Sequence, residues 1–220
     1  MVNPDATDCY FYKYFTRKEE KQLLSHIAKH KSLLAQRDHA WIRFGLRTGA
    51  RVETLAGFTV DDAALCLKEK KIIFRAEILK GRKEGSLVRV GKKRKPLVIM
   101  LTDARKAALL DLLRVRRAMG FPDDEHNQAL VMSERGEGLS IRSFQARIKE
   151  WAIDAGLERG EEVSPHWLRH TCAKRIYAAS TAKDPRVSVK IELGHSSLAS
   201  TDIYTQPDKE THIAAIVEAC

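Results

Sequence analysis

Two short runs rich in β-forming residues flank a basic stretch near the middle of this sequence. The first run, K-I-I-F-R-A-E-I, occupies residues 71–78, and the second, P-L-V-I-M-L, occupies residues 96–101. Lys, Arg and Gly dominate the stretch between them. Runs of this kind around such a connection predict a long antiparallel β-hairpin. Pairing of Ile72 near Leu101 would place the tip of this hairpin near Gly85.

Outside the hairpin, apolar residues recur mostly with the period of an α-helix. Thr16 and Glu19 form a capping box that opens a helix to about Ala35, and Asp38 caps the next one. From about Thr59 the pattern changes to strands. Later helices are expected to begin at Asp103, Ser140, Ser164 and Asp184, with a last one in the tail at 211–219. The sequence therefore predicts an α+β fold, mostly helical, with a small antiparallel sheet and the long basic β-hairpin.

Residues 1–15 precede the first expected helix and are expected to form an N-terminal arm or linker. They contain an aromatic cluster made of Tyr10, Phe11, Tyr12, Tyr14 and Phe15. Such a cluster could dock on the core, or it could be the stub of an upstream domain. Residues 16–220 are expected to form one domain, which is long enough to bury a large core.

The charge of the chain points to a polyanion as its partner. There are 39 Lys and Arg residues against 29 Asp and Glu residues, a formal net charge of +10. This balance favours nucleic acid, the alternative being a basic surface that is merely solvated. No apolar run is long enough to span a membrane, and the N-terminus lacks the features of a signal peptide. The four Cys residues are scattered without a C-x-x-C pair, which favours the reducing cytoplasm.

The residues with the strongest chemical character lie between positions 164 and 206. His166 and Arg169 are three positions apart, so a helix would place them on one face near its first turn, where an anion is favoured. Arginine can bind phosphate oxygens through two parallel hydrogen bonds. His195 follows in an L-G-H motif, and Tyr204 comes nine residues later, on or just before a short helix. Together these groups suit chemistry on a phosphodiester, with Tyr204 as the candidate nucleophile.

Other cations could complete this set. Arg51 follows a T-G-A turn, at a corner between two helices that can aim a side chain into a cleft. The basic hairpin could reach DNA or deliver a lysine to an active site, or it could be a solvated edge hairpin blunted by lysines. His166 and His170 have the spacing of metal-binding helices, but the glutamate of H-E-x-x-H is absent, so we expect no metal site there. Each motif alone also occurs on ordinary surfaces, and the signal lies in their joint order.

With these motifs in order, the chain resembles the tyrosine recombinases, also called the phage integrase family. The matching stretches are T-G-A-R-V-E-T-L (48–55), the hairpin at 72–101, S-P-H-W-L-R-H-T (164–171) and L-G-H-S-S-L-A-S-T-D-I-Y-T (193–205). The resemblance covers about residues 16 to 210. It marks residues 16–220 as a tyrosine recombinase catalytic domain.

The resemblance implies a role for each motif residue. Arg51 and Arg169 look like the pair that holds the scissile phosphate, and His195 looks like the residue that hydrogen-bonds a non-bridging oxygen. His166 looks like the proton-transfer group, the base or hydrogen-bond partner of the tyrosine. Tyr204 looks like the nucleophile, which forms a 3′-phosphotyrosine and frees a 5′-hydroxyl. In the family a hairpin lysine protonates that leaving oxygen, and no metal, ATP or other cofactor is needed.

Two features depart from the family pattern. The hairpin is longer than usual, so its lysine is ambiguous between Lys80, counted from the first strand, and Lys92, matched through G-K-K-R-K before the second strand. We favour Lys80, because the family presents its lysine at the end of the first strand. Thr54 stands where many relatives have Glu or Asp supporting the arginine. The adjacent Glu53 is expected to point elsewhere on a helix.

The resemblance implies a site-specific DNA recombinase or integrase. Its implied partners are double-stranded DNA, further copies of the chain that form a tetramer on the DNA, and accessory DNA-bending proteins. The tail at 211–219 is expected to dock on a neighbouring protomer, or on its own domain in the free protein. Two other functions stay open: a catalytically degenerate DNA-binding regulator on the same scaffold, and DNA relaxation of the type IB topoisomerase kind.

Most relatives carry a DNA-binding domain ahead of the catalytic one, and few residues precede the first expected helix here. The chain is therefore either a fragment or one of the short members, such as the fimbrial phase-variation inverters.

Overall fold

The computed structural model describes residues 13–79, 95–123, 126–195 and 197–206. In chain order the elements are α1 (Arg17–Lys29), α2 (Leu33–Thr48), α3 (Val52–Gly57), α4 (Val60–Glu69), β1 (Lys71–Phe74), η2 (Ala76–Ile78), β2 (Leu97–Met100), α5 (Asp103–Ala118), α6 (Ile141–Asp154), η3 (Gly160–Glu162), α7 (Pro165–Ala179), α8 (Pro185–Leu193) and η4 (Ala199–Thr205). The predicted α+β fold, mostly helical with a small antiparallel sheet, is confirmed. The hairpin tip and the tail at 211–219 lie outside the described residues. No helix within them is both long and apolar enough to cross a membrane.

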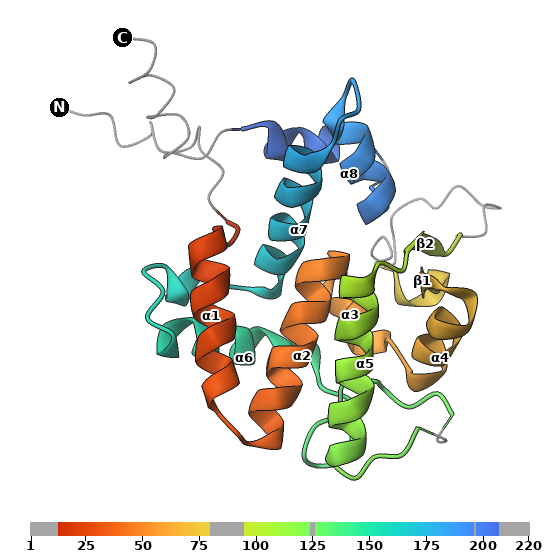
Figure 1. The fold of residues 1–220 in the computed structure, drawn as a ribbon, viewed down its shortest axis with the longest axis vertical. Helices are drawn as coiled ribbons and strands as arrows, with labels where there is room; N and C mark the ends of the chain where they lie inside the picture. Colours follow the sequence, from red (N-terminus) through yellow and green to blue (C-terminus); the bar gives the residue numbers. More distant parts are fainter. Residues whose placement is uncertain (1–12, 80–94, 124–125, 196, 207–220) are drawn as a thin grey trace, which may run out of the picture.

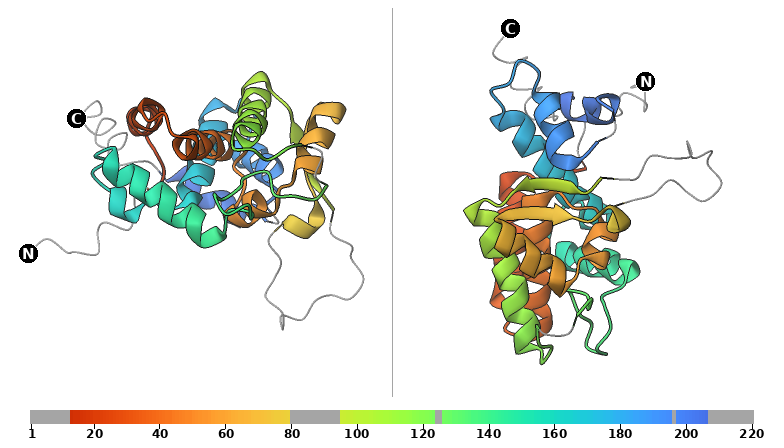
Figure 2. Two further views of the ribbon diagram at one scale, coloured as in Figure 1. Left: turned by 90° about the horizontal axis from the view of Figure 1, so that it is seen from below. Right: turned by 90° about the vertical axis from the view of Figure 1, so that its right-hand side faces the viewer.

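The helices form a lower body and a smaller upper part (Figure 1). In the body, α2 packs between α1 and α5, and α7 begins against α2. The C-terminal half of α7 rises out of the body and carries α8 and η4. Figure 2 shows the two-stranded sheet crossing the molecule where the two parts meet. The sheet and the start of the upper part, which are far apart in the sequence, are thereby brought together at this junction.

Two hydrophobic clusters correspond to the two parts. The larger one fills the body around side chains such as Trp41, Phe44 and Leu168. The smaller one joins α7, α8 and η4 through the buried residues Cys172, Ala173, Val189, Leu193 and Tyr204. Removal of this apolar surface from water stabilises the upper part and holds the Tyr204 side chain in place.

The N-terminal helices differ from the prediction in their boundaries. The capping box of Thr16 and Glu19 is confirmed, but α1 ends well before Ala35. Ser32 caps α2 by accepting a hydrogen bond from the amide of Ala35. Asp38, predicted to be a cap, lies inside α2 and is fully buried. Its carboxylate accepts hydrogen bonds from side chains of α2 and α6 and not from backbone amides, so its sequence position alone was misleading.

The segment after Thr59 is a helix, and the predicted start of the strands at this point is wrong. Thr59 and Asp62 form a second capping box that opens α4, and this local signal is present in the sequence. The sheet begins only afterwards. In it, Ile72 pairs with Ile99, two residues from the predicted pairing with Leu101.

The later helices begin close to the predicted residues. Ser140 and Asp184 cap α6 and α8 with their side chains, and Ser164 occupies the N-cap position of α7. At α5 the cap is Thr102, one residue before the predicted Asp103. The hydroxyl of Thr102 accepts a hydrogen bond from the amide of Arg105. Thr and Asp are both common N-cap residues, so the residue type alone did not separate the two positions.

The described end of the N-terminal arm docks on the domain. The amide of Phe15 donates a hydrogen bond to Thr171 Oγ1 at 2.9 Å, and its ring centroid lies 5.4 Å from that of Trp167. Tyr14 packs against the smaller cluster. The other aromatic residues of the arm lie outside the described residues.

Replacing Gly49 by alanine should destabilise the fold more than the same change at Gly156. Both glycines have a left-handed φ, +64° and +69°, so each change is expected to cost about 1–2 kcal/mol of backbone strain. At Gly49 the new Cβ would also lie 2.4 Å from Leu193 Cδ2, whereas the nearest atom at Gly156 is 3.9 Å away. Urea unfolding of both variants measures the difference. Equal losses of unfolding free energy would contradict the described packing of α8 on this turn.

Candidate active site

Arg51 is positioned by the turn that ends α2. Gly49 closes that helix with a φ of +64°. Arg51 then occupies the N-cap position of α3 in an extended conformation, with its side chain partly buried. Its positive charge contributes a lowering of the pKa of Arg169, of His195 and of Tyr204. Arg51 therefore lies within electrostatic range of three other predicted site residues.

Arg169 lies in the first half of α7 and ties the two parts of the molecule together. Its guanidinium donates hydrogen bonds to the carbonyl oxygen of Gly49 at 2.7 Å and to that of Leu193 at 2.9 Å. The residue is 5% exposed, and burial followed by the charge of Arg51 lowers its pKa to about 10. It therefore stays protonated at neutral pH. A guanidinium has five N–H donors, so these two contacts leave others for an oxyanion.

Tyr204 lies on η4 and is 2% exposed. Its hydroxyl is 3.0 Å from Nδ1 of His170, and its ring is stacked with that of His195 at a centroid distance of 6.3 Å. Burial raises the pKa of the phenol, while the charges of Arg169 and Arg51 act in the opposite direction. The hydroxyl is protonated at neutral pH and needs a proton acceptor if it is to act as a nucleophile.

His195 directly follows Gly194, which ends α8 in a left-handed conformation. The amide of His195 donates a hydrogen bond to the carbonyl oxygen of Lys190 at 3.0 Å. Its Nδ1 is buried and has no hydrogen-bond partner within the described part of the chain. Burial, then the charges of Arg169 and Arg51, lowers the pKa of this histidine to about 4. The ring is therefore neutral at pH 7 and can offer one N–H group to an oxygen.

The structure places His170 beside the tyrosine, whereas the resemblance implied proton transfer by His166. His166 is exposed one turn earlier on α7, and the centroids of the two rings are 6.2 Å apart. In the sequence, His170 stands out only through its spacing from His166, which is that of metal-binding helices. Its spacing from His166 placed both rings on one face of α7, but the sequence could not show which ring would meet η4.

The acidic support of the arginines also differs from the expectation. Thr54 donates a hydrogen bond to the carbonyl oxygen of Ile78 at 3.2 Å, which ties α3 to the segment after β1. Glu53 was expected to point elsewhere. It lies close enough to Arg169 for its negative charge to contribute a raising of the pKa of Arg169. An acid near the arginine is thus present one residue before the family's usual position.

The hairpin lysine cannot be assigned from the described residues. Lys80 and Lys92 both fall in the segment 80–94, which lies outside them. The preference for Lys80 therefore stays a prediction.

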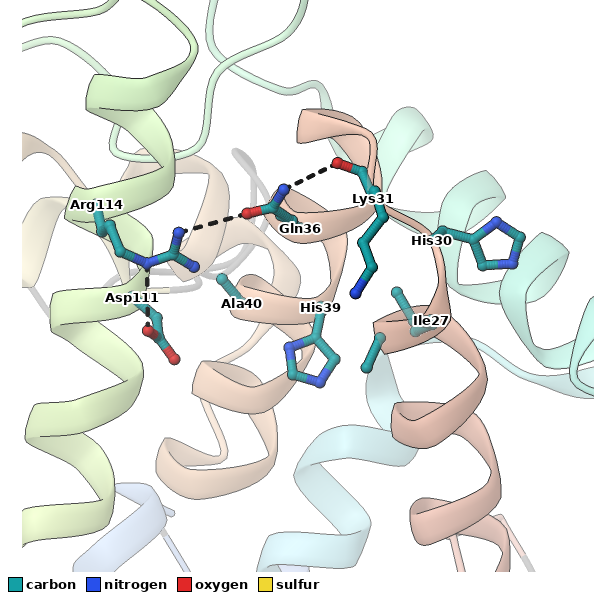
Figure 3. A pocket seen from close by; sticks show the side chains of 9 residues that line it. Ile27, His30, Lys31, Gln36, His39, Ala40, Asp111 and Arg114 are labelled. Carbon is teal, nitrogen blue, oxygen red and sulfur yellow. Dashed lines mark hydrogen bonds and ion pairs between the residues drawn. The ribbon is translucent and has the colours of Figure 1, made fainter.

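A cavity of about 350 Å³ lies at the end of α2 opposite Gly49 (Figure 3). Its lining includes His39 of α2 and Arg114 of α5, and Arg114 contacts both Asp111 and Gln36. None of the predicted site residues that the structure describes lines this cavity. The described residues also contain no group of three or more His, Cys, Asp or Glu side chains that could hold a metal ion.

Comparison with known proteins shows the family of this chain. The model of the phage integrase family matches residues 13–211. Tyrosine recombinase XerC of Caldanaerobacter subterraneus subsp. tengcongensis is 33% identical over 195 residues, 89% of this chain and 47% of that protein. Tyrosine recombinase XerC of Shewanella amazonensis is 35% identical over 185 residues, 84% of this chain and 53% of that protein. The chain thus spans about half the length of the curated relatives it matches.

Solved structures show the same fold. XerA recombinase superimposes with a TM-score of 0.67 at 23% identity, covering 94% of this chain and 63% of that one. XerH site-specific recombinase, bound to a palindromic difH substrate in a post-cleavage complex, gives a TM-score of 0.67 at 23% identity, covering 98% of this chain and 55% of that one. Given the family model that matches most of its length, the chain belongs to the phage integrase family of tyrosine recombinases.

Proposed function

We propose that residues 16–220 are the catalytic domain of a site-specific recombinase that cuts and rejoins double-stranded DNA through a 3′-phosphotyrosyl bond at Tyr204. The observation that carries the proposal is the convergence of Arg51, Arg169 and Tyr204 from three separate segments. Membership of the family supports it. The DNA substrate and the post-cleavage state of the related XerH complex support it further.

In the proposed reaction, Arg51 and Arg169 bind the non-bridging oxygens of the scissile phosphate and stabilise the charge that builds there in the transition state. The Tyr204 hydroxyl loses its proton and attacks phosphorus, and the bond from phosphorus to the 5′-oxygen breaks. The hairpin lysine, Lys80 or Lys92, protonates that oxygen. Attack by a 5′-hydroxyl then reverses the step and rejoins a strand. Because the phosphotyrosyl bond conserves the energy of the phosphodiester, rejoining needs no nucleotide cofactor.

The histidines fit supporting roles in this reaction. His195 has a neutral ring beside Tyr204, which suits a hydrogen bond to a non-bridging oxygen. His166 is exposed in the first turn of α7. The unpaired amides of a helix N-terminus favour an anion there, so His166 can add a further hydrogen bond near the phosphate.

Recombination as the outcome also requires several protomers on DNA. We include in the proposal a tetramer on the DNA, contacts from the tail at 211–219 to a neighbouring protomer, and accessory DNA-bending proteins. A type IB topoisomerase would use the same chemistry without exchanging strands. An assay for strand exchange, run beside one for relaxation of supercoiled DNA, separates the two functions.

Binding to duplex DNA should weaken steeply as salt rises. The logarithm of the binding constant is expected to fall with the logarithm of salt at a slope of about −0.9 per phosphate contacted, because counterions are released. The excess of basic residues, +10 in formal charge, supplies such contacts. Fluorescence anisotropy at increasing salt measures the slope. A nearly flat dependence would show that this charge does not serve DNA binding.

Changing Arg169 to lysine should reduce DNA cleavage by about 100-fold or more, since a planar guanidinium that meets several acceptors at once is not replaced by a single ammonium. Lysine cannot reach the carbonyl oxygens of Gly49 and Leu193 and also bind a phosphate. Single-turnover cleavage, with the unfolding temperature measured in parallel, tests this. A folded variant that cleaves at the wild-type rate would contradict the proposed role.

Covalent capture tests the proposed function without knowledge of the target sequence. A pool of nicked duplexes with a randomised segment is incubated with the chain, denatured in detergent, and searched for DNA that stays attached to protein. The nick lets a short fragment diffuse away after cleavage, so that rejoining is prevented. We expect the attached DNA to converge on one sequence, which we call the captured duplex. Binding without any attached DNA would contradict the proposal and favour a DNA-binding regulator.

A further inference from the structure

We propose that Nδ1 of His170 is the atom that accepts the proton of the Tyr204 hydroxyl as the tyrosine attacks phosphorus. This inference rests on the proposed function and adds a catalytic residue to it. It also changes one expectation, because the resemblance had suggested His166 for proton transfer.

Nδ1 of His170 lies 3.0 Å from the hydroxyl oxygen of Tyr204, a normal distance for a hydrogen bond that carries a proton. The ring centroids are 5.7 Å apart and tilted by 55°, so the contact is made through the hydroxyl edge of the tyrosine. A general base must lie within hydrogen-bond reach of the proton it removes, and His170 meets this requirement before any substrate is bound.

The contact joins two elements that pack together in one hydrophobic cluster. His170 lies on α7 and Tyr204 on η4, and both elements contribute to the smaller hydrophobic cluster. Arg169, adjacent to His170, binds the last residue of α8 through the carbonyl oxygen of Leu193. The same guanidinium is proposed to hold the phosphate. The acceptor, the nucleophile and the phosphate clamp are therefore positioned by one short stretch of α7.

Burial and neighbouring positive charge keep His170 neutral before the reaction. After burial, the largest effects on the pKa of His170 come from basic groups: His166 and Arg169 on α7, His195 after α8, and Lys13 from the N-terminal arm. Burial first, and then these groups, lowers the pKa of His170 to about 4. The imidazole is therefore neutral at pH 7, and one of its two ring nitrogens is then a hydrogen-bond acceptor. A nearby phosphate would supply the negative charge that stabilises the imidazolium once the proton has moved.

The proposed step balances. The O–H bond of Tyr204 breaks, its proton goes to Nδ1 of His170, and the oxygen forms the bond to phosphorus. The bond to the 5′-oxygen breaks, and that oxygen takes its proton from the hairpin lysine. On rejoining, both protons return. His170 thus acts on the nucleophile, whereas the lysine acts on the leaving group.

The test compares His170→Asn with His170→Ala in single-turnover cleavage of the captured duplex. Asparagine can place its amide oxygen where Nδ1 lies, so it keeps the hydrogen bond but cannot take a proton. We expect both variants to lose about 100-fold or more at pH 7, the range found for loss of a general base. His39→Asn is the matched control, because His39 is a partly buried histidine, also with a lowered pKa, that lines the cavity in Figure 3. A His170→Asn variant that cleaves within about threefold of the wild type would overturn the proposal.

The pH profile and a modified substrate exclude a purely structural role. Without a base, cleavage depends on ionised tyrosine, so the rate of each variant should rise about tenfold per pH unit towards the tyrosine pKa, while the wild type stays flat. Added imidazole should partly restore His170→Ala. A 5′-bridging phosphorothiolate has a leaving group that needs no proton, so the defect should persist on that substrate. Recovery on the phosphorothiolate, or a defect that neither high pH nor imidazole relieves, would overturn the proposal.

Two controls distinguish failure of this inference from failure of the proposed function. The wild type must form the adduct first, since its failure to do so would count against the proposed function alone. Folding of each variant is checked by its unfolding temperature. His170→Gln serves as the second variant if asparagine or alanine prevents folding, with the same loss and the same rise with pH expected.

Discussion

Tyr204→Phe should form no covalent adduct with the captured duplex, while its affinity for the same DNA stays within a few-fold of the wild type. Phenylalanine has no hydroxyl to attack phosphorus, so the expected loss is complete. Tyr204 is 2% exposed in the smaller hydrophobic cluster, and phenylalanine fills the same space. The variant loses the hydrogen bond to His170, at a cost of about 1 kcal/mol. It should therefore stay folded.

A denaturing gel run beside anisotropy measurements checks both halves of this expectation. Tyr177→Phe is the matched control, because this tyrosine lies on α7 and, like Tyr204, packs in the smaller cluster, but it is outside the proposed site. It should form the adduct normally. An adduct that persists in Tyr204→Phe would remove this residue from the reaction.

Asp38→Ala should lower the free energy of unfolding by about 3–5 kcal/mol, the cost of leaving a buried charge without its partner. The carboxylate is fully buried. One oxygen accepts hydrogen bonds from Arg37 and from Trp41 at 3.1 Å, and the other accepts from Arg147 at 2.7 Å and from Trp151 at 2.9 Å. Its removal leaves these donors without this acceptor and removes the hydrogen bonds that link α2 to α6.

Urea unfolding measures this effect, with Asp111→Ala as the control. Asp111 is a surface acid that pairs with Arg43 and Arg114, and its side chain is 33% exposed. A pair of that kind contributes about 0–1 kcal/mol. Similar losses in the two variants would contradict the central place of Asp38 in the core.

The candidate site could be predicted from the order of its motifs. Arg51, Arg169, His195 and Tyr204 come from distant parts of the sequence, and the structure brings them into electrostatic range of one another. The helix caps at Thr16, Ser140 and Asp184 could also be predicted, because a cap depends on neighbours only a few residues away.

What the sequence could not give depends on contacts between elements. Asp38 has the residue type of a cap but binds donors on α6, which only the fold brings near. His170 contacts Tyr204 because α7 and η4 pack against each other. A local sequence pattern does not predict which residues meet between two such elements. The helix at Val60–Glu69 is a different case, since its capping box of Thr59 and Asp62 is a local signal that the sequence does contain.

The most direct test of the central claim is to locate the DNA on the protein by mass spectrometry. The adduct with the captured duplex is digested with nuclease and trypsin. Cleavage after Lys190 and Lys209 releases a peptide that contains Tyr204 as its one tyrosine. The account predicts that this peptide carries a nucleotide and that its fragment ions place the added mass on Tyr204. A nucleotide on any other residue, or an adduct whose Tyr204 peptide is unmodified, would contradict it.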